Sequence, residues 1–244
     1  MAARMRLSIV VPAYNEARRI NNAYSRLERF FSQRDYDMEY IFVEDGSSDG
    51  TADILKGLEK SAPGKIRVIV NEHNMGKGLS IKKGVLEASG DYILFMDADM
   101  ATPLTAFLDF EPYMGKYDCI MGSRWLVESN IRIPQPWYRR FMGRVFYMIV
   151  RSFFLKDITD TNCGFKCYRR EVARDIFSKQ LVNGWGFDVE LLYIAQKRNY
   201  SIKEVPVEWA HGRDSKVILF KVPVSTLVEL ARIKINDWKG RYGK

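Results

Sequence analysis

The chain has 244 residues, of which 47% are hydrophobic and 13% aromatic, and this composition excludes an intrinsically disordered protein. Its three cysteines are too few for a disulfide framework, which favours a reducing compartment. The net charge of +8 is uneven, because residues 1–122 carry −3 and residues 123–244 carry +11. The second half is therefore predicted to face an anionic partner: phosphate groups, a lipid headgroup surface or nucleic acid.

Apolar runs alternate with amphipathic stretches through the first half of the chain. Strands are predicted at 7–11, 40–43, 66–70, 92–96 and 119–121, and helices at 16–32, 50–61, 78–88 and 103–114. This alternation predicts an α/β fold with a mostly parallel central sheet flanked by helices. Ligands of such sheets bind beyond the carboxyl ends of the strands.

A polar cluster follows each of the five predicted strands. The clusters occupy residues 12–16, 44–47, 74–78, 97–99 and 122–124. Because the carboxyl ends of parallel strands lie at one edge of a sheet, we expect the five clusters to converge on one crevice.

Three residues in these clusters have a chemical interpretation of their own. Glu16 is expected in the first turn of a helix, where a carboxylate suits the helix dipole and can hold a ribose or a base. Asp45 follows a strand directly and is placed to accept a hydrogen bond from a base N–H. Lys77 lies between two glycines before a helix, which allows close backbone approach to a phosphate and adds charge.

Asp97 and Asp99 follow the apolar run 92–96. Two carboxylates at the end of a buried strand repel each other unless a cation lies between them. Hard oxygen ligands favour Mg²⁺ or Mn²⁺, typically shared with a substrate phosphate. Taken alone, the segment fits equally well a strand end capped by ordinary turn-forming aspartates.

Two stretches of the basic second half are predicted to be amphipathic helices. In segment 137–156, Arg140, Arg144 and Arg151 form a narrow cationic stripe on a broad apolar surface, which is typical of an interfacial helix. The alternative is a core-packed helix with solvated arginines. Stretch 223–242 repeats the pattern and is expected to dock on a membrane or on a partner subunit. No stretch is long and apolar enough to predict a membrane-spanning helix.

Taken together, the clusters resemble the nucleotide-sugar-binding half of the family 2 glycosyltransferases, which have a GT-A fold. The matching segments are 9–16, 43–51, 74–78, 97–99, 122–124, 160–166, 185–192 and 215–216. The later motifs are similar to the polyprenyl-phosphate (dolichyl-phosphate) glucosyl- and mannosyltransferases. Ala101 stands where the mannose-transferring members carry a glutamine that helps to hold the metal, which tilts the resemblance toward the dolichyl-phosphate β-glucosyltransferase branch.

The resemblance implies a set of site residues. Those expected to bind the nucleotide sugar are Pro12, Tyr14, Glu16, Asp45, Gly46, Lys77, Gly78, Asp97, Ala98 and Asp99. Asp97 and Asp99 are also the expected ligands of Mg²⁺ or Mn²⁺, and together with Arg124 they form the expected catalytic group. The acceptor phosphate is assigned to Arg124, Arg140, Ser215 and Lys216, and Asp188 and Glu190 are expected to orient the sugar.

The domain organisation expected from this resemblance is a GT-A catalytic domain over residues 1–217. Its nucleotide-sugar half would cover 1–122 and its acceptor half 123–217, and a basic amphipathic helix would follow over 218–244.

The reaction expected from the resemblance is an inverting transfer of glucose, or of mannose, to dolichyl or polyprenyl phosphate, which gives a β-linked lipid-phosphate sugar. UDP-glucose is the favoured donor and GDP-mannose the second. A phosphate monoester is already an anion near pH 7, its second pKa being about 6, so no side-chain base is required. The expected location is peripheral, on the cytosolic face of a membrane, with a membrane-spanning partner subunit as an open possibility.

Other functions remain open from the sequence alone. A family 2 enzyme with a glycan, protein or sterol acceptor is the closest alternative. A nucleotidyltransferase would also contain paired carboxylates, but its glycine-rich N-terminal loop is missing. A basic nucleic-acid- or membrane-binding module would explain the charge of the second half, but not the buried strand that ends in two aspartates, and no nucleic-acid-binding motif is visible.

Overall fold

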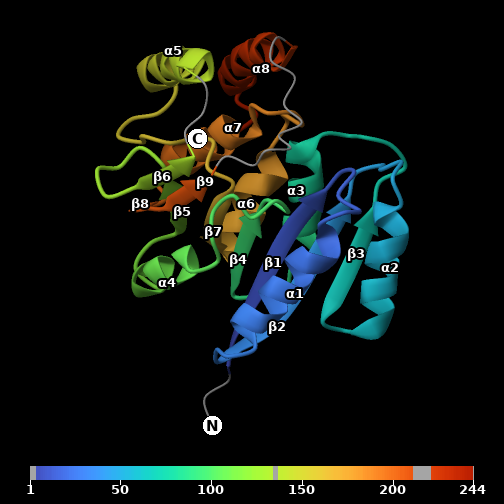
Figure 1. The fold of residues 1–244 in the computed structure, drawn as a ribbon. Coiled ribbons are helices and arrows are strands. Elements are labelled where there is room, and N and C mark those ends of the chain that lie inside the picture. The colour runs from blue at the N-terminus through green and yellow to red at the C-terminus, as the bar shows by residue number, and fades with distance from the viewer. Residues whose placement is uncertain (1–3, 134–136, 211–220, 244) are drawn as a thin grey trace. The chain divides into compact units, whose positions relative to one another are not determined.

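The computed structural model describes residues 4–133, 137–210 and 221–243. The chain divides into two compact units. The first comprises residues 1–100 and 165–178, and the second comprises residues 101–164 and 179–244. Figure 1 labels the helices and strands of both units.

The first unit contains a mostly parallel sheet. Its strands are β1 (Met5–Ala13), β2 (Tyr36–Glu44), β3 (Ile66–Val70), β4 (Tyr92–Met96) and β7 (Phe165–Arg169). Their order is β3-β2-β1-β4-β7, with β7 antiparallel to β4 and the other pairs parallel. The α/β prediction is confirmed, and each predicted strand of this unit is present.

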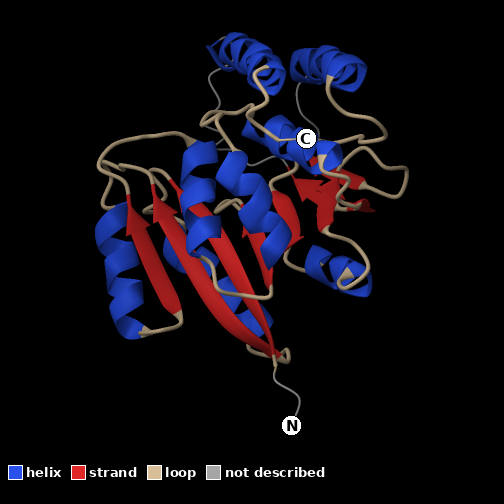
Figure 2. Cartoon of the chain, turned by 180° about the vertical axis from the view of Figure 1, so that it is seen from behind, coloured by secondary structure: helices blue, strands red, loops and turns tan. Residues whose placement is uncertain are grey.

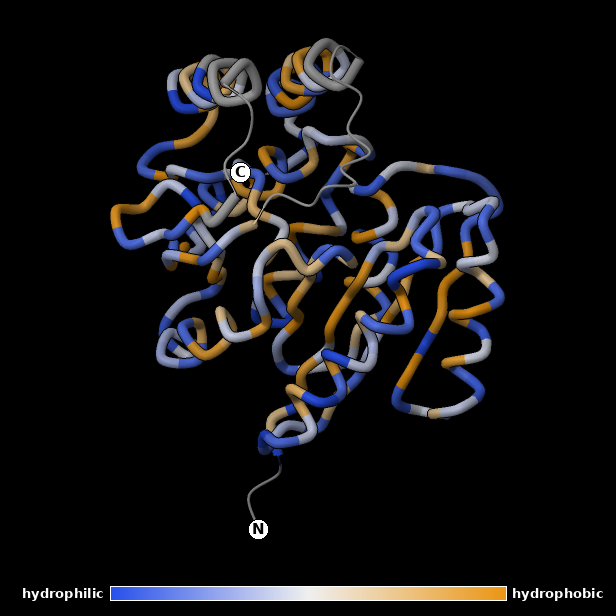
Figure 3. The backbone as a smooth tube through the Cα atoms, viewed as in Figure 1, coloured by the Kyte–Doolittle hydropathy of each residue, from blue (hydrophilic) through white to orange (hydrophobic). Residues whose placement is uncertain are grey.

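The helices of the first unit cover both faces of this sheet (Figures 1 and 2). They are α1 (Ile20–Phe31), α2 (Thr51–Ser61), α3 (Lys77–Glu87) and α6 (Arg170–Lys179). Consecutive residues at the centre of β1 and β2 are buried, as expected for strands enclosed on both sides. Figure 3 shows apolar stretches along the strands of this sheet, interrupted by hydrophilic residues. Gly84 allows α3 to approach the sheet, because a Cβ there would lie 2.5 Å from a Val10 methyl group.

Three local predictions differ from the structure. The strand β1 runs through Pro12 to Ala13, whereas the predicted strand ends at residue 11. The pairing of β1 with β4 stops at Val10. Pro12 has no N–H, but at its position there is no hydrogen bond to β4 that could be lost. Helix 103–114 is replaced by α4 (Ala106–Phe110) and a 3₁₀ turn (Glu111–Tyr113) that contains Pro112. The third difference, the start of α1, affects Glu16 and is described with the site.

The described residues of the second unit form two parallel strand pairs and three long helices. The pairs are β5 (Cys119–Ser123) with β8 (Ile202–Pro206) and β6 (Asn130–Ile133) with β9 (Glu208–Ala210). The helices are α5 (Trp137–Phe153), α7 (Phe187–Lys197) and α8 (Lys221–Trp238). Helix α7 is buried along most of its length.

Helix α8 packs against α7 with one face and exposes an apolar stripe on another. Leu230 and Ile233 are buried, whereas Leu227, Val228 and Trp238 are exposed, with 89% of Trp238 accessible. Helix α5 lies beside α8 in both views and exposes Met148 and Phe153 (Figures 1 and 2). Among the residues that the structure describes, no helix is both long and apolar enough to cross a membrane.

Candidate functional site

The buried strand β4 ends at Met96, and a tight turn places both predicted aspartates beyond its carboxyl end. The backbone N–H of Met100 donates to the carbonyl of Asp97 over 3.1 Å, and Met100 adopts a left-handed φ of 51°. The Asp97 side chain is 35% exposed, Asp99 is exposed, and Ala98 between them is buried. Solvent can therefore reach both carboxylates.

Lys77 brings the cluster that follows β3 into contact with the cluster that follows β4. It is the first residue of α3, and its Nζ lies 2.6 Å from Asp97 Oδ1. The preceding Gly76 has a φ of 98°, which favours glycine, and Gly78 is buried in the first helical turn. Two of the five predicted clusters, 74–78 and 97–99, therefore do meet within the first unit.

Asp45 holds the loop that leads to Lys77. Its buried carboxylate accepts hydrogen bonds from the Asn71 amide (2.8 Å) and from the backbone N–H groups of Met75 (2.9 Å) and Gly76 (3.1 Å). A carboxylate has about four acceptor positions, so three of them are used within the protein. Asp45 thus orders the loop that precedes α3, a role that was not predicted for it.

Gly46 is required by close backbone packing. Its φ is 71°, and a Cβ at this position would lie 2.4 Å from the carbonyl carbon of His73. Glu44 stabilises the turn, because its buried carboxylate accepts from the N–H groups of Gly46 (3.2 Å) and Ser47 (2.5 Å). The Ser47 hydroxyl in turn accepts from the backbone N–H of Asn15, which joins the first and second clusters.

The prediction that Glu16 lies in the first turn of a helix is wrong. Helix α1 begins at Ile20, and Glu16 lies in the turn before it. The backbone N–H of Glu16 donates to Thr51 Oγ1 over 2.8 Å, and its carboxylate pairs with Arg19 Nε at 2.5 Å. Tyr14, in the same loop, is 41% exposed.

In the second unit, Arg124 directly follows β5 and is held by Asp160. Its Nε and Nη2 donate to the two oxygens of the Asp160 carboxylate over 2.6 and 2.8 Å, and its backbone N–H donates to the same group over 3.0 Å. Its guanidinium carbon lies 5.3 Å from the centre of the Trp209 ring. Burial alone would lower the pKa of Arg124, but the Asp160 carboxylate raises it above its ordinary value, so the cation is permanent.

Glu190 is part of the core and not of an open sugar site. It is fully buried and accepts from the backbone N–H groups of Leu181 and Val182 and from the Tyr242 hydroxyl, the last over 2.6 Å. This arrangement is at odds with the predicted sugar-orienting role of Glu190, because its acceptor positions are used internally. Asp188 is also buried and helps to raise the pKa of Arg124.

Three predicted acceptor contacts cannot be placed. Ser215 and Lys216 lie outside the described residues, and Arg140 is in α5 but its side chain is not among those described. Their roles stay predictions.

The Glycosyl transferase family 2 model matches residues 8–177, which include β1 to β4, the loops after them, Arg124 and Asp160. The chain belongs to glycosyl transferase family 2. This protein is therefore a glycosyltransferase.

Curated relatives of this glycosyltransferase align over most of its length. It is 35% identical to the dolichyl-phosphate beta-glucosyltransferase of Dictyostelium discoideum, in an alignment that covers 96% of this chain and 76% of the relative. It is 37% identical to the human protein of the same name, over 88% of this chain and 70% of the relative.

Solved structures confirm the predicted GT-A fold of the glycosyltransferase. Mannosyl-3-phosphoglycerate synthase from Rubrobacter xylanophilus matches with a TM-score of 0.71 and 16% identity, over 98% of this chain and 76% of that one. Glucosyl-3-phosphoglycerate synthase from Mycobacterium tuberculosis, in complex with Mn²⁺, uridine diphosphate and glucosyl-3-phosphoglycerate, matches with a TM-score of 0.68 and 20% identity, over 94% and 80%.

The two accessible aspartates of the glycosyltransferase fit a divalent cation. Among the described residues there is no group of three or more His, Cys, Asp or Glu side chains that could enclose a metal. Mg²⁺ is typically held by one or two carboxylates together with water and substrate phosphates, and Asp97 and Asp99 offer this kind of incomplete shell.

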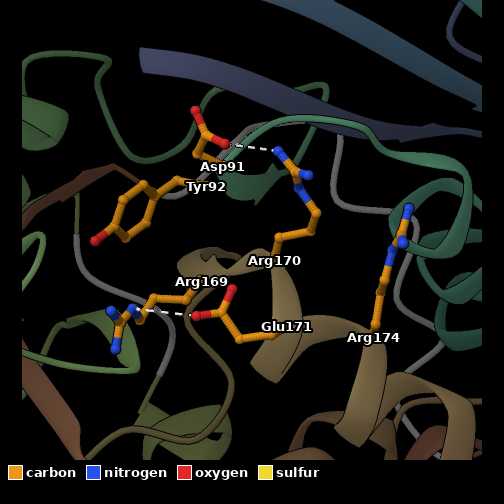
Figure 4. A pocket seen from close by; sticks show the side chains of 6 residues that line it. All are labelled: Asp91, Tyr92, Arg169, Arg170, Glu171 and Arg174. Carbon is orange, nitrogen blue, oxygen red and sulfur yellow. Dashed lines mark hydrogen bonds and ion pairs between the residues drawn. The ribbon is translucent and has the colours of Figure 1, made fainter.

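A concavity of the glycosyltransferase lies at the end of β4 opposite to Asp97. It has a volume of about 450 Å³ and is lined by Asp91, Tyr92, Arg169, Arg170, Glu171 and Arg174 (Figure 4). Arg170 pairs with Asp91 at 2.6 Å and Arg169 with Glu171 at 3.6 Å. It contains none of the predicted site residues, because Asp97 follows the other end of the strand.

Sequence reasoning missed several residues that shape the site of the glycosyltransferase. Glu44, Asn71 and Asp160 are buried, and each holds a loop that carries a predicted residue. Glu44 and Asp160 lie inside the motifs that carried the resemblance, so their position was a usable signal. Asn71 follows β3 but offers no motif of its own.

Proposed function

We propose that this glycosyltransferase transfers glucose from UDP-glucose to dolichyl phosphate and so forms a β-linked dolichyl phosphate glucose. The observation that carries the proposal is the 32–37% identity, over 88% or more of the chain, to several curated dolichyl-phosphate beta-glucosyltransferases. A structural neighbour, glucosyl-3-phosphoglycerate synthase, was solved with uridine diphosphate, and this pairing of a glucosyl product with a uridine nucleotide supports UDP-glucose over GDP-mannose.

The donor half of the reaction is assigned to the first unit. Lys77, at the N-terminus of α3, is placed to attract a diphosphate, since helix N-termini favour anions. Asp97 and Asp99 would hold Mg²⁺ or Mn²⁺, which when bound neutralises charge on the diphosphate leaving group. Tyr14, Glu16 and the loop ordered by Asp45 are proposed to contact the nucleoside.

The acceptor half is assigned to the second unit. An oxygen of the lipid phosphate attacks the anomeric carbon, and the bond from that carbon to the diphosphate oxygen breaks, which inverts the anomeric centre. No proton has to be removed, because the attacking oxygen is already anionic near pH 7. Arg124, a permanent cation fixed by Asp160, is proposed to position the phosphate, with Arg140, Ser215 and Lys216 as further contacts.

The exposed faces of α5 and α8 support a peripheral position on a membrane, where the lipid acceptor is found. Leu227, Val228, Ile235 and Trp238 present apolar surface, and exposed basic residues lie on the same helix. Apolar side chains beside cations are the pattern of helices that lie in the membrane interface. We place the enzyme on the cytosolic face, where nucleotide sugars are available.

The test is transfer of radiolabel from UDP-glucose and GDP-mannose to dolichyl phosphate in detergent, with Mg²⁺, Mn²⁺ or EDTA. We expect metal-dependent labelling of the lipid from UDP-glucose and a loss of at least about a hundredfold in Asp99→Ala, since the charge on the leaving group is then less well neutralised. Asp53→Ala, which removes an exposed carboxylate of α2, is the matched control.

The outcomes of this experiment test the proposed donor and the proposed acceptor separately. Labelling from GDP-mannose alone would correct the donor. Hydrolysis of UDP-glucose without labelled lipid would leave the donor site in place and refute the acceptor, and glycan, protein and sterol acceptors would be tested next.

A further inference from the structure

The support of Arg124 extends beyond Asp160 to a second carboxylate, that of Glu204 in β8. Glu204 Oε2 accepts a hydrogen bond from the backbone N–H of Thr159 over 2.9 Å. Its Oε1 accepts from the Thr159 hydroxyl over 2.8 Å and from the backbone N–H of Asp160 over 3.0 Å. Glu204 therefore fixes the backbone on which the Asp160 side chain is carried.

The Thr159 hydroxyl links this loop to the end of β5. A hydroxyl has one proton, and that of Thr159 is donated to Glu204, so the Ser123 hydroxyl must donate to Thr159 across their 2.8 Å contact. Ser123 is fully buried and directly precedes Arg124. The loop is thus held from β8 and from β5, two strands that are themselves paired.

The Asp160 carboxylate has no acceptor position left for a ligand. It is 3% exposed, and the hydrogen bonds that it accepts include three from Arg124 and one from the backbone N–H of Asn162 at 3.1 Å. A carboxylate has about four such positions. Asp160 is therefore a residue that holds Arg124 and not one that binds substrate or metal.

Arg124, in contrast, keeps donors for an anion. A guanidinium group has five N–H donors, and Asp160 receives one from Nε and one from Nη2. With respect to the residues that the structure describes, donors on Nη1 and Nη2 remain, and their direction is set by the two-point contact with Asp160.

We propose that Glu204 is a positioning residue that acts through Thr159 and Asp160 to aim Arg124 at the acceptor phosphate. The inference rests on the proposed function of Arg124. A carboxylate is needed at position 204, because three donors converge on its two oxygens and an amide would direct its own N–H groups against one of them. An error of about 1 Å in such positioning can cost a hundredfold in rate.

The test is Glu204→Gln in the full-length enzyme, assayed for transfer to dolichyl phosphate with each substrate varied in turn. We expect the KM for dolichyl phosphate to rise about tenfold, as for the loss of one hydrogen bond to a charged group, and the KM for UDP-glucose to stay unchanged. If Glu204 were needed only for folding, its substitution would lower the fraction of active enzyme and therefore the apparent kcat. The KM for dolichyl phosphate would then not rise relative to the KM for UDP-glucose.

Two further variants separate positioning from a local defect. In an Arg124→Ala background, Glu204→Gln should change kcat/KM less than about twofold, because residues that act through one another are not additive. Glu128→Gln makes the same chemical change at an exposed residue of this unit and should change nothing. If Glu204→Gln does not fold, Thr159→Val, which removes only the hydroxyl contacts, takes its place.

The outcomes distinguish this inference from the proposed function. If the wild-type enzyme does not label dolichyl phosphate, both fail. Two results would refute the positioning role while the wild type still labels the lipid and the proposed function stands. One is an unchanged KM for dolichyl phosphate in Glu204→Gln. The other is that Glu204→Gln lowers kcat/KM by the same factor in the Arg124→Ala background as in the wild type.

Discussion

At the carboxyl end of β4, Asp97 already contacts a cation that the protein itself supplies. The Lys77 ammonium group lies 2.6 Å from Asp97, and both side chains are partly exposed. Partly exposed ion pairs contribute at most about 1 kcal/mol to stability, so this pair is not explained by a need for stability. Its position beside the predicted diphosphate site makes a role in donor binding the better explanation.

We predict that Lys77→Gln weakens the binding of UDP in the presence of Mn²⁺ by about tenfold, because one charge-assisted hydrogen bond to the diphosphate is lost. Isothermal titration calorimetry measures the affinity. Lys60→Gln, an exposed residue in the last turn of α2, is the control. Equal UDP affinities for Lys77→Gln and the wild type would contradict the assignment, and the thermal unfolding temperature should be nearly the same in all three proteins.

At the scale of elements, α8 is tied to α7 by polar contacts as well as by packing. Asp237 accepts a hydrogen bond from the Tyr193 hydroxyl over 2.6 Å and pairs with Lys197. Burial and the bond to Asp237 raise the pKa of Tyr193 to about 12, so this hydroxyl stays protonated near neutral pH. Beyond the end of α8, the fully buried Tyr242 donates to Glu190 of α7. These contacts hold the helix whose other face is exposed.

Replacement of Tyr242 by Phe should lower the free energy of unfolding by about 1–3 kcal/mol, because the buried Glu190 carboxylate loses one of its donors. Urea unfolding followed by tryptophan fluorescence measures the change. Tyr117→Phe removes the hydroxyl of a half-buried tyrosine that makes a ring contact with Tyr113, and its effect should stay below about 0.5 kcal/mol. If the urea midpoint of unfolding is unchanged in Tyr242→Phe, the hydrogen bond to Glu190 does not contribute to stability, and packing of the ring alone holds Tyr242 in place.

For the whole molecule, the uneven charge and the exposed apolar stripe of α8 predict attraction to an anionic lipid surface. The second half of the chain carries +11, and Trp238, Ile235 and Leu227 expose large parts of their side chains. Electrostatic attraction would bring the protein to the surface, and insertion of the apolar side chains would keep it there.

We predict that the protein sediments with vesicles that contain phosphatidylserine and that binding weakens as salt is raised. The triple variant Leu227→Ala, Ile235→Ala and Trp238→Ala should bind at least about tenfold more weakly, since each exposed side chain contributes apolar area on insertion. The matched control is Leu86→Ala, Leu108→Ala and Val127→Ala, which removes exposed apolar side chains elsewhere. Equal binding of the two triple variants would contradict a docking role for α8.

The approximate ends of most strands, and the polar clusters that follow them, were determined by the sequence alone. An apolar run of three to five residues that stops at a polar group is a local signal. Strand β2 ends at the first residue of its predicted cluster, β4 ends directly before its cluster and β5 ends within its cluster, whereas β3 ends at Val70, with three residues between it and the cluster at 74–78. The start of α1 at Ile20, and not at Glu16, was not predictable in this way. Thr51 and Asp49 accept the N–H groups of Glu16 and Ala17, and these partners are more than 30 residues away.

Which carboxylates face a ligand and which hold the protein together was decided only by the tertiary structure. Asp45 finds its partners 26–31 residues away, Asp160 finds Arg124 at a separation of 36, and Glu190 finds Tyr242 at a separation of 52. A carboxylate in a sequence motif looks the same whether its oxygens accept from a substrate or from buried N–H groups. The difference lies in the donors that folding brings to it, because a buried carboxylate without donors costs a large free energy of desolvation.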